Sequence, residues 1–399
     1  MLKAPTPAPP PKKPPPSPLQ SALDRLFAKA GPASGALVYD LDAKLPLYAL
    51  RADVARPPAS VEKLYTSVAL LRQLGPNATF QTAVLGAGHL GADGVWHGDL
   101  YLRGGGDPTF GDGTFNQVWE QGYGPTAVEL AGQLSAHGIR QVTGKVIPDE
   151  SLFDTRRGGP TSGYAPDVGD YGGQLSALTY DHGSTAGRLS PAAFAAKELV
   201  LNLHAVHVKA QAAADSAVTP AGARPLAVVQ SPPLSVLVKL MDVPSDDLFA
   251  ELLTKQLGVK LAGAGTTDAG AGVIAATIAG YGLHPQIVDG SGLSRADSSA
   301  PAQVVGLLGA VWHTPLGDML MASLPIVGVS GTVSNLAVHS PAQGHCVAKT
   351  GTLNFVTNLA GYCAGRDGHQ LAFALFIDGP SNQAATKLLG EMLAAIARY

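Results

Sequence analysis

The 399-residue sequence has few cysteines, few charged residues and no long apolar run. Its two cysteines, Cys346 and Cys363, exclude a multi-disulfide framework and a metal site built from four thiolates. Charged residues make up 14% of the chain, against about 25% in typical globular proteins. Because no apolar stretch reaches the ~18 residues that cross a bilayer, we predict no transmembrane segment.

Charge of one sign is also lacking. The chain carries 27 Lys and Arg against 30 Asp and Glu, a net charge of −3. A protein without a basic surface cannot neutralise many phosphates, so we predict no nucleic-acid partner. The eleven histidines show neither H-x-x-x-H nor H-E-x-x-H spacing, and His204 and His207 read as ordinary helix residues. We therefore expect no metal site and no cofactor.

The length and the 46% of apolar residues predict two or three globular domains. Residues 1–19 differ from the rest because they hold nine of the 31 prolines, which is typical of a disordered or polyproline II tether. This start has no apolar core of a signal peptide in the present numbering. Either the protein stays inside the cell or the numbering begins after a removed export signal.

Hydrophobic periodicity predicts a sheet flanked by helices at the two ends of the chain. Before the middle segment we expect a helix, a hairpin and a buried helix, at Leu19–Phe27, Ala36–Leu41 with Leu45–Leu50, and Ser60–Leu74. After it we expect helices at Pro233–Met241, Asp246–Leu257, Ala302–His313 and Ala384–Ala397, and strands at Ala227–Gln230, Cys346–Lys349, Phe355–Tyr362 and Leu371–Ile377.

The middle segment changes to short strands, glycine turns and single helices. Its expected elements are strands at Asp99–Arg103 and Gln141–Ile147 and helices at Thr126–His137 and Pro191–His207. We interpret it as an inserted α+β domain of residues 83–223 inside a catalytic domain of residues 20–82 and 224–399. The predicted fold class is α+β, an antiparallel sheet flanked by helices with a smaller inserted domain.

The two cysteines lie on neighbouring predicted strands. A turn near Asn354 places Cys346 opposite Cys363, so a cross-strand disulfide is geometrically possible. Two buried, reduced thiols are the alternative. The pairing alone leaves both open.

Three short motifs carry candidate chemistry. Ser60-Val-Glu-Lys63 is an S-x-x-K at the start of a helix, where one turn brings the lysine amine to the serine hydroxyl. Lys349-Thr350-Gly351-Thr352 ends a strand, and a lysine with hydroxyls there can hold a carboxylate while the glycine allows close approach of a substrate. Ser245-Asp246-Asp247 precedes a helix and alone indicates only a cap.

Taken together, these motifs occur in the order S-x-x-K, S-D-x, K-T-G with gaps of 185 and 104 residues. This is the pattern of penicillin-binding proteins and class A β-lactamases. The chain resembles the class C low-molecular-mass penicillin-binding proteins, the D-alanyl-D-alanine carboxypeptidase/endopeptidase family, from about residue 33 onward. Further stretches that carry the resemblance are Pro58–Thr66, Leu100–Pro108, Glu129–Leu134, Leu175–Leu178, Asp289–Ser294, Leu324–Thr332, Ala348–Leu353 and Leu359–Tyr362.

The resemblance implies a transpeptidase-like domain and a role for each motif residue. Ser60 would attack the D-Ala-D-Ala carbonyl, with Lys63 as general base and Ser245 as proton relay. Lys349, Thr350 and Thr352 would bind the terminal carboxylate, Gly351 and Asp247 would line the substrate site, and the backbone N–H groups of Ser60 and Thr352 would form the oxyanion hole.

It also implies where the protein acts and on what. The expected substrates are peptidoglycan stem peptides, with D-Ala cross-links as a second target, and β-lactams would acylate Ser60. Such a substrate implies export to the periplasm or cell envelope. No cofactor is implied.

Two features depart from the family pattern. Asp247 stands where the family has Asn, which replaces an amide donor with an acceptor-only carboxylate and places a negative charge near Lys63. An ionised Asp247 would raise the pKa of Lys63 and slow acylation, unless the aspartate faces elsewhere or stays protonated. The insert between Ser60 and Ser245 is also short, so we expect two domains and no additional third one.

Two other functions fit part of the sequence. A β-lactamase is the first, because Glu198-Leu-Val-Leu-Asn202 spells the E-x-x-L-N of class A deacylation, but this glutamate precedes Ser245 and belongs to a helix of the insert. The second is a catalytically weak or inactive wall-binding module, suggested by Asp247. Labelling of Ser60 by penicillin together with peptide hydrolysis distinguishes them.

Overall fold

We describe the protein from a computed structural model that covers residues 16–183 and 187–399. The predicted tether of residues 1–19 lies largely outside this range, but its last four residues, 16–19, lie within it. Helix α1 (Pro18–Phe27) begins inside it, because Ser17 and Gln20 form a reciprocal capping box and Pro18 occupies the first helical position. The prediction was therefore wrong at residues 18 and 19.

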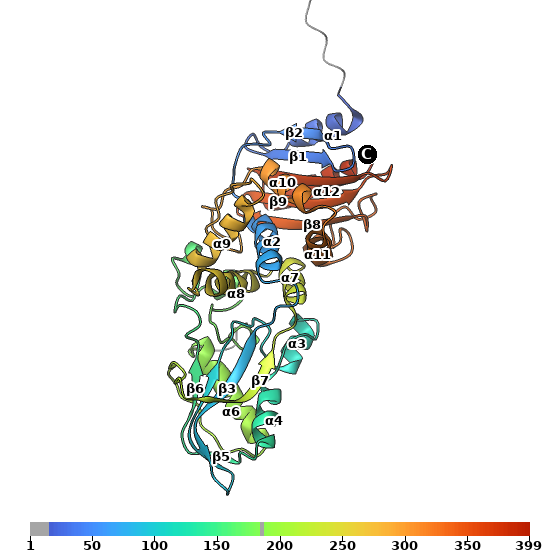
Figure 1. The fold of residues 1–399 in the computed structure, drawn as a ribbon. Helices are drawn as coiled ribbons and strands as arrows, with labels where there is room; N and C mark the ends of the chain where they lie inside the picture. Colours follow the sequence, from blue (N-terminus) through green and yellow to red (C-terminus); the bar gives the residue numbers. More distant parts are fainter. Residues whose placement is uncertain (1–15, 184–186) are drawn as a thin grey trace, which may run out of the picture.

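The larger part of the molecule is built on one antiparallel sheet, in the order β2-β1-β10-β9-β8 (Figure 1). Helices α1 and α12 pack on one face of the sheet over one apolar core. Helices α2 and α10 pack on the other face over a second apolar core. The strands are β1 (Gly35–Asp40), β2 (Leu45–Leu50), β8 (Cys346–Leu353), β9 (Val356–Ala364) and β10 (Gln370–Asp378). The helices on this sheet and beside it are α2 (Lys63–Gln73), α7 (Leu234–Asp242), α8 (Asp247–Leu257), α9 (Thr267–Ala279), α10 (Pro301–Val311), α11 (Pro315–Ser323) and α12 (Asn382–Ile396). We call this part the large unit.

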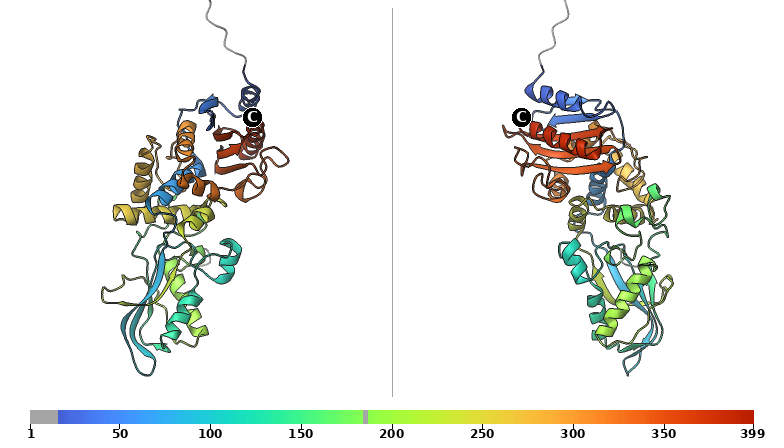
Figure 2. Two further views of the ribbon diagram at one scale, coloured as in Figure 1. Left: turned by 45° about the vertical axis from the view of Figure 1, so that its right-hand side comes forward. Right: turned by 180° about the vertical axis from the view of Figure 1, so that it is seen from behind.

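A second sheet forms the other end of the elongated molecule (Figure 2). Its strands follow the order β5-β4-β3-β7, with β6 also paired to β4, and a separate core packs them against α4 and α6. The elements are β3 (Gln81–Leu90), β4 (Val95–Arg103), α3 (Gly113–Trp119), α4 (Ala127–Ala136), β5 (Gln141–Val142), β6 (Val146–Asp149), α5 (Val168–Tyr171), α6 (Pro191–Ala205) and β7 (Arg224–Gln230). We call this part the inserted unit.

The α+β class and the transpeptidase-like architecture are confirmed by this layout. The domain bounds stay a prediction. Since β3 begins at Gln81 and its partner β7 ends at Gln230, we propose bounds close to these residues in place of 83 and 223. Strand β7 would then belong to the inserted unit.

Most predicted helices and strands occur within a few residues of their expected bounds. Two differences have clear causes. The predicted strand Gln141–Ile147 is two short strands, β5 and β6, because Gly144 passes so close to Gly98 and Asp99 that no side chain fits and the pairing is interrupted. Helix α9 was not predicted, because its small apolar residues give no clear period; it forms where Thr266 caps it and α2 and α8 pack against it.

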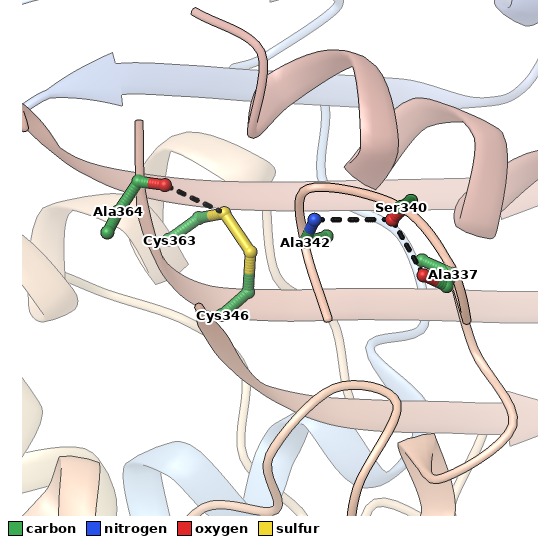
Figure 3. Close-up of a disulfide and its surroundings, with 6 residues drawn as sticks. All are labelled: Ala337, Ser340, Ala342, Cys346, Cys363 and Ala364. Carbon is green, nitrogen blue, oxygen red and sulfur yellow. Dashed lines mark hydrogen bonds between the residues drawn. A yellow bond between two sulfur atoms is a disulfide. The ribbon is translucent and has the colours of Figure 1, made fainter. Parts of the chain in front are cut away.

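Cys346 and Cys363 form a disulfide across β8 and β9 (Figure 3). The two residues are direct partners in the strand register, as the turn near Asn354 predicts. Of the two alternatives that the sequence left open, the disulfide is the one the structure contains. It lies three residues before Lys349 and so ties down the strand that carries this lysine.

None of the helices within residues 16–183 and 187–399 is long and apolar enough to cross a membrane.

Candidate active site

Ser60 lies in a short 3₁₀ turn, Ala59–Glu62, that leads into α2. Ala59 before it has a left-handed backbone, φ 51°, a conformation in which a non-glycine residue is uncommon and which occurs often at functional sites. One turn later Lys63 is fully buried, and its Nζ lies 3.1 Å from the Oγ of the half-buried Ser60. The contact expected from S-x-x-K is present.

Lys63 has two further acceptors. Its Nζ donates to Asp247 Oδ1 at 2.5 Å and to the backbone oxygen of Ser291 at 2.8 Å. An ammonium has three N–H donors, so these two acceptors and Ser60 account for all of them. Burial raises the pKa of Asp247, and the positive charge of Lys63 acts in the opposite direction. Asp247 therefore faces Lys63, and of the two orientations considered from the sequence it adopts the one that pairs the two charges.

Ser245 lies in the connection between α7 and α8. It has a left-handed backbone, φ 67°, and its Oγ accepts a hydrogen bond from Lys349 Nζ at 2.7 Å. Asp246 is the N-cap of α8, where its carboxylate accepts from the N–H of Phe249 at 2.8 Å. The capping role expected for the Ser245-Asp246-Asp247 triplet thus belongs to Asp246, while Ser245 and Asp247 contact the two lysines.

Lys349 is fully buried on β8. Besides Ser245, its Nζ donates to the backbone oxygen of Thr350 at 3.0 Å. Both are neutral acceptors, and one N–H donor of the ammonium is left over. Burial, and next the charge of Lys63, lower the pKa of Lys349 to about 7, while Asp242 and Asp247 act to raise it.

The remaining K-T-G-T residues border the same region. Thr350 Oγ1 donates to Thr332 Oγ1 at 2.8 Å, and Thr352 is exposed to solvent. At Gly351 a Cβ atom would lie 2.5 Å from the backbone oxygen of Pro58 and 3.0 Å from the N–H nitrogen of Val61. The glycine is therefore required by the close approach of β8 to the turn that carries Ser60, in addition to any role toward a substrate.

The structure thus brings the three motifs together at one place. Lys63 links Ser60 to Asp247, Lys349 links β8 to Ser245, and each lysine lies within the electrostatic influence of the other. Within the described residues, no group of three or more His, Cys, Asp or Glu side chains is arranged to hold a metal ion.

Comparison with known proteins assigns the chain to a family. The model of the D-Ala-D-Ala carboxypeptidase 3 (S13) family matches residues 19–193 and 185–398. The chain belongs to this family. It is 31% identical to carboxypeptidase DacB of Mycolicibacterium smegmatis over 92% of this chain and 82% of the relative, and 29% identical to a D-alanyl-D-alanine carboxypeptidase of Actinomadura over 93% and 82%.

A solved structure extends the likeness to the fold. Penicillin-binding protein 4 (dacB) from Haemophilus influenzae superposes with a TM-score of 0.80 at 20% identity and covers 94% of this chain and 99% of its own. The S13 chain described here is accordingly a serine-type D-Ala-D-Ala carboxypeptidase, and the resemblance to class C penicillin-binding proteins is confirmed.

Four residues of the site were missed from the sequence. Ser291 provides the backbone acceptor for Lys63, and its stretch was noted only as similar to the family. Asn358 on β9 donates to the backbone oxygens of Pro57 and Pro58 and so holds the chain just before Ser60. Thr332 likewise ends a stretch that was noted only as similar to the family. The buried Asp242 had no recognisable signal, because its role depends on which segments the fold brings together.

The E-x-x-L-N pattern has an ordinary structural explanation. Glu198 lies on α6 of the inserted unit, and Asn202 Nδ2 donates to the backbone oxygen of Glu198 one turn earlier in the same helix. Among the described residues, no hydrogen bond joins Glu198 to Ser60 or Lys63. The pattern therefore gives no support to a class A deacylation site.

Proposed function

We propose that this carboxypeptidase cleaves the terminal D-Ala-D-Ala bond of peptidoglycan stem peptides through an acyl-enzyme on Ser60. The single observation that carries the proposal is that two serine–lysine hydrogen bonds, Ser60–Lys63 and Ser245–Lys349, lie in the same site. A hydroxyl beside a buried amine is the arrangement needed for an activated nucleophile. D-Ala cross-links are a second target of the same chemistry.

In the acylation step Ser60 Oγ forms a bond to the carbonyl carbon and the C–N bond to the terminal D-Ala breaks. The proton of Ser60 passes to Lys63, and Ser245 relays it onward to the leaving amine, so that both Lys63 and Ser245 return to their starting protonation. Water then hydrolyses the ester and restores Ser60. The backbone N–H groups of Ser60 and Thr352 form the oxyanion hole, a role supported by the close packing of β8 on the turn of Ser60.

Lys349 binds the carboxylate of the terminal D-Ala through its unused N–H donor. A buried ammonium hydrogen-bonded only to neutral acceptors is well suited to an incoming anion, because the charge is compensated when the substrate arrives. The hydroxyls of Thr350 and Thr352 and the close backbone at Gly351 complete the carboxylate site. β-Lactams carry an equivalent carboxylate and acylate the same serine.

Asp247 lowers the rate of this reaction. Its hydrogen bond to Lys63 stabilises the protonated amine, whereas the general base must be neutral. We therefore propose an enzyme that is acylated slowly. The extreme form of this effect is the second candidate function, a penicillin-binding-like module that binds the cell wall without turnover.

The substrate places the protein outside the cytoplasmic membrane. Peptidoglycan stem peptides occur in the cell wall, so we propose that the protein is exported to the periplasm or cell envelope.

Intact-protein mass spectrometry after incubation with benzylpenicillin tests the proposal. We expect one covalent adduct on the wild-type protein, none on Ser60→Ala, and release of D-alanine from a diacyl-D-Ala-D-Ala peptide by the wild type only. An adduct of equal yield on Ser60→Ala would refute the nucleophile. No adduct and no D-alanine would favour the inactive module, and rapid penicillin turnover without D-alanine release would favour a β-lactamase.

A further inference from the structure

The positive charge of Lys349 is not balanced by its direct hydrogen-bond partners. It is fully buried, yet both of its hydrogen-bond acceptors, Ser245 Oγ and the Thr350 oxygen, are neutral. Buried charges in proteins are normally balanced by an opposite charge. Asp247 is committed to Lys63 through the 2.5 Å contact. A second anion is needed to balance the second lysine.

Asp242 is a fully buried carboxylate that can provide this second anion. It is the last residue of α7 and precedes Ser245 by three residues. Its Oδ2 accepts hydrogen bonds from Ser67 Oγ and from Ser323 Oγ, each at 2.8 Å. Ser67 lies one turn after Lys63 on α2, so this contact brings Asp242 to the face of α2 that carries the general base.

The other oxygen of Asp242 is not used by this network. Oδ1 is buried and has no hydrogen-bond partner among the described residues. A carboxylate that served only to tie α2, α7 and α11 together would need one acceptor oxygen, and an uncharged amide would supply it at a lower desolvation cost. The charge itself therefore requires an explanation, and the cations whose charge acts on Asp242 are Lys349 and Lys63.

The hydrogen bond from Ser323 connects Asp242 to the proposed carboxylate-binding residues through a second route. Ser323 ends α11, and the chain continues through residues 324–332 to Thr332, whose backbone N–H donates to the Val243 oxygen at 3.2 Å. Thr332 Oγ1 in turn accepts from Thr350. Asp242 thus lies where the segments that hold Lys63, Ser245 and Thr350 meet.

We propose that Asp242 is a positioning residue for the peptidase reaction: its buried negative charge keeps the ammonium of Lys349 protonated to receive the terminal carboxylate of the substrate. The residue acts through Lys349 and does not touch the substrate. This inference rests on the proposed role of Lys349 and adds a residue to it.

The electrostatics support this assignment. The charged groups that face Lys349 are Lys63 from α2, Asp242 from α7 and Asp247 from α8. Lys63 lowers the pKa of Lys349 and the two aspartates raise it. Conversely, burial raises the pKa of Asp242 to about 6, and Lys349 is the strongest of the influences that lower it. Removing the charge of Asp242 must therefore lower the pKa of Lys349.

The decisive variant is Asp242→Asn, which keeps an acceptor oxygen for Ser67 and Ser323 but removes the charge. If the pKa of Lys349 falls by one unit, the protonated fraction above that pKa falls about tenfold. We expect the KM for diacyl-D-Ala-D-Ala to rise about tenfold at pH 8, and to approach the wild-type KM near pH 5.5, where Lys349 is protonated in both proteins. For an analogue with an amidated C-terminus the KM should not change with pH.

Ser67→Ala and Ser323→Ala are matched controls, because each removes one tie and keeps the charge. We expect both to lower the melting temperature and to leave the pH profile of KM in place. If Asp242 had only a structural role, the opposite pattern would result. Asp242→Asn would then lower the melting temperature and change KM by the same factor at every pH and for both substrates. That result would overturn the proposal.

A second measurement does not need an active enzyme. Carbon-13 NMR of lysine ε-carbons, assigned with Lys349→Arg, follows the protonation of Lys349 directly. We expect a titration near pH 7 in the wild type and at lower pH in Asp242→Asn. Identical titrations would refute the inference even if peptide hydrolysis is confirmed, and a shifted titration would support it even if hydrolysis is absent.

Discussion

At the scale of single residues, the site is defined by how two buried lysines are compensated. Lys63 has a direct anionic partner in Asp247, and Lys349 has only neutral direct partners. In the family pattern an asparagine stands at position 247, so Lys63 would there meet an amide oxygen in place of a carboxylate. A single change from amide to acid therefore gives Lys63 a carboxylate acceptor in place of a neutral one.

We predict that Asp247→Asn increases the rate of acylation. A hydrogen bond to a charged group contributes about 1.5–3 kcal/mol, so its loss should favour the neutral amine and raise the second-order acylation constant by about 10- to 100-fold. The constant is measured at pH 7 from the growth of covalent label with a fluorescent penicillin.

The variant Asp247→Ala distinguishes the effect of removing the negative charge from the effect of adding an amide that can contact the ligand. If the charge alone slows the reaction, both variants should react faster than the wild type. If the asparagine amide also contacts the ligand, only Asp247→Asn should. An acylation constant at or below that of the wild type in both variants would show that the Lys63–Asp247 contact does not limit acylation.

Motif residues were predictable from the sequence, but residues defined by burial were not. The spacing of Ser60 and Lys63 implies their contact by helix geometry alone. Asp242 and Glu62 gave no such signal. Glu62 lies inside S-x-x-K yet is completely buried, and neither of its carboxyl oxygens has a hydrogen-bond partner among the described residues. Burial and the nearby Asp289 raise its pKa, a property that depends on packing between distant segments.

At the scale of elements, β8 carries the residues that we propose to bind the substrate carboxylate, and it lies at the edge of the sheet. Its inner side pairs with β9 along its whole length, from Cys346 to Leu353. The turn near Asn354 made this pairing predictable. The disulfide was left open, because strand register fixes which residues face each other but not the redox state of the compartment.

We predict that removing the disulfide destabilises the protein without abolishing the fold. For a loop of 17 residues the chain-entropy model gives about 3 kcal/mol. The double variant Cys346→Ala/Cys363→Ala should lose about this free energy of unfolding in urea titration.

The wild type in the presence of a reductant provides the control for side-chain volume. It should lose nearly as much stability as the double variant, because both lack the cross-link. Equal stability of the oxidised and reduced wild type would mean that the cross-link does not restrict the unfolded chain.

At the scale of the whole molecule, α8 joins the catalytic site to the inserted unit. Its first residue, Asp247, contacts Lys63, and near its other end Lys255 Nζ lies 2.5 Å from Asp154 Oδ1 of the inserted unit. Gln256 donates to the backbone oxygen of Gly105 beside it. A small apolar cluster completes this junction with residues of both units: Phe153, Tyr171, Leu175, Ala177, Leu248 and Leu252. The existence of an insert was predictable from the change in sequence texture; this junction was not, because no local pattern pairs Asp154 with Lys255.

We predict that Asp154→Ala strongly destabilises the junction. Lys255 is 1% exposed, so the variant leaves a buried ammonium without its partner. Breaking a buried pair in this way costs about 3–5 kcal/mol, and the value here should lie near the lower end because Asp154 is 21% exposed. The free energy of unfolding is measured by guanidinium titration.

Two controls make this prediction specific to the buried charge. Asp154→Ala combined with Lys255→Met removes both charges at similar volume and should recover most of the lost stability. Arg156→Ala breaks the exposed pair with Asp268, in which the two side chains are 45% and 63% exposed, and should cost less than about 1 kcal/mol.

Since α8 also carries Asp247, the single variant should change the penicillin acylation rate and the double variant should restore it. A single variant as stable as Arg156→Ala would mean that α8 does not depend on this pair, and that the apolar cluster and the remaining polar contacts stabilise the junction.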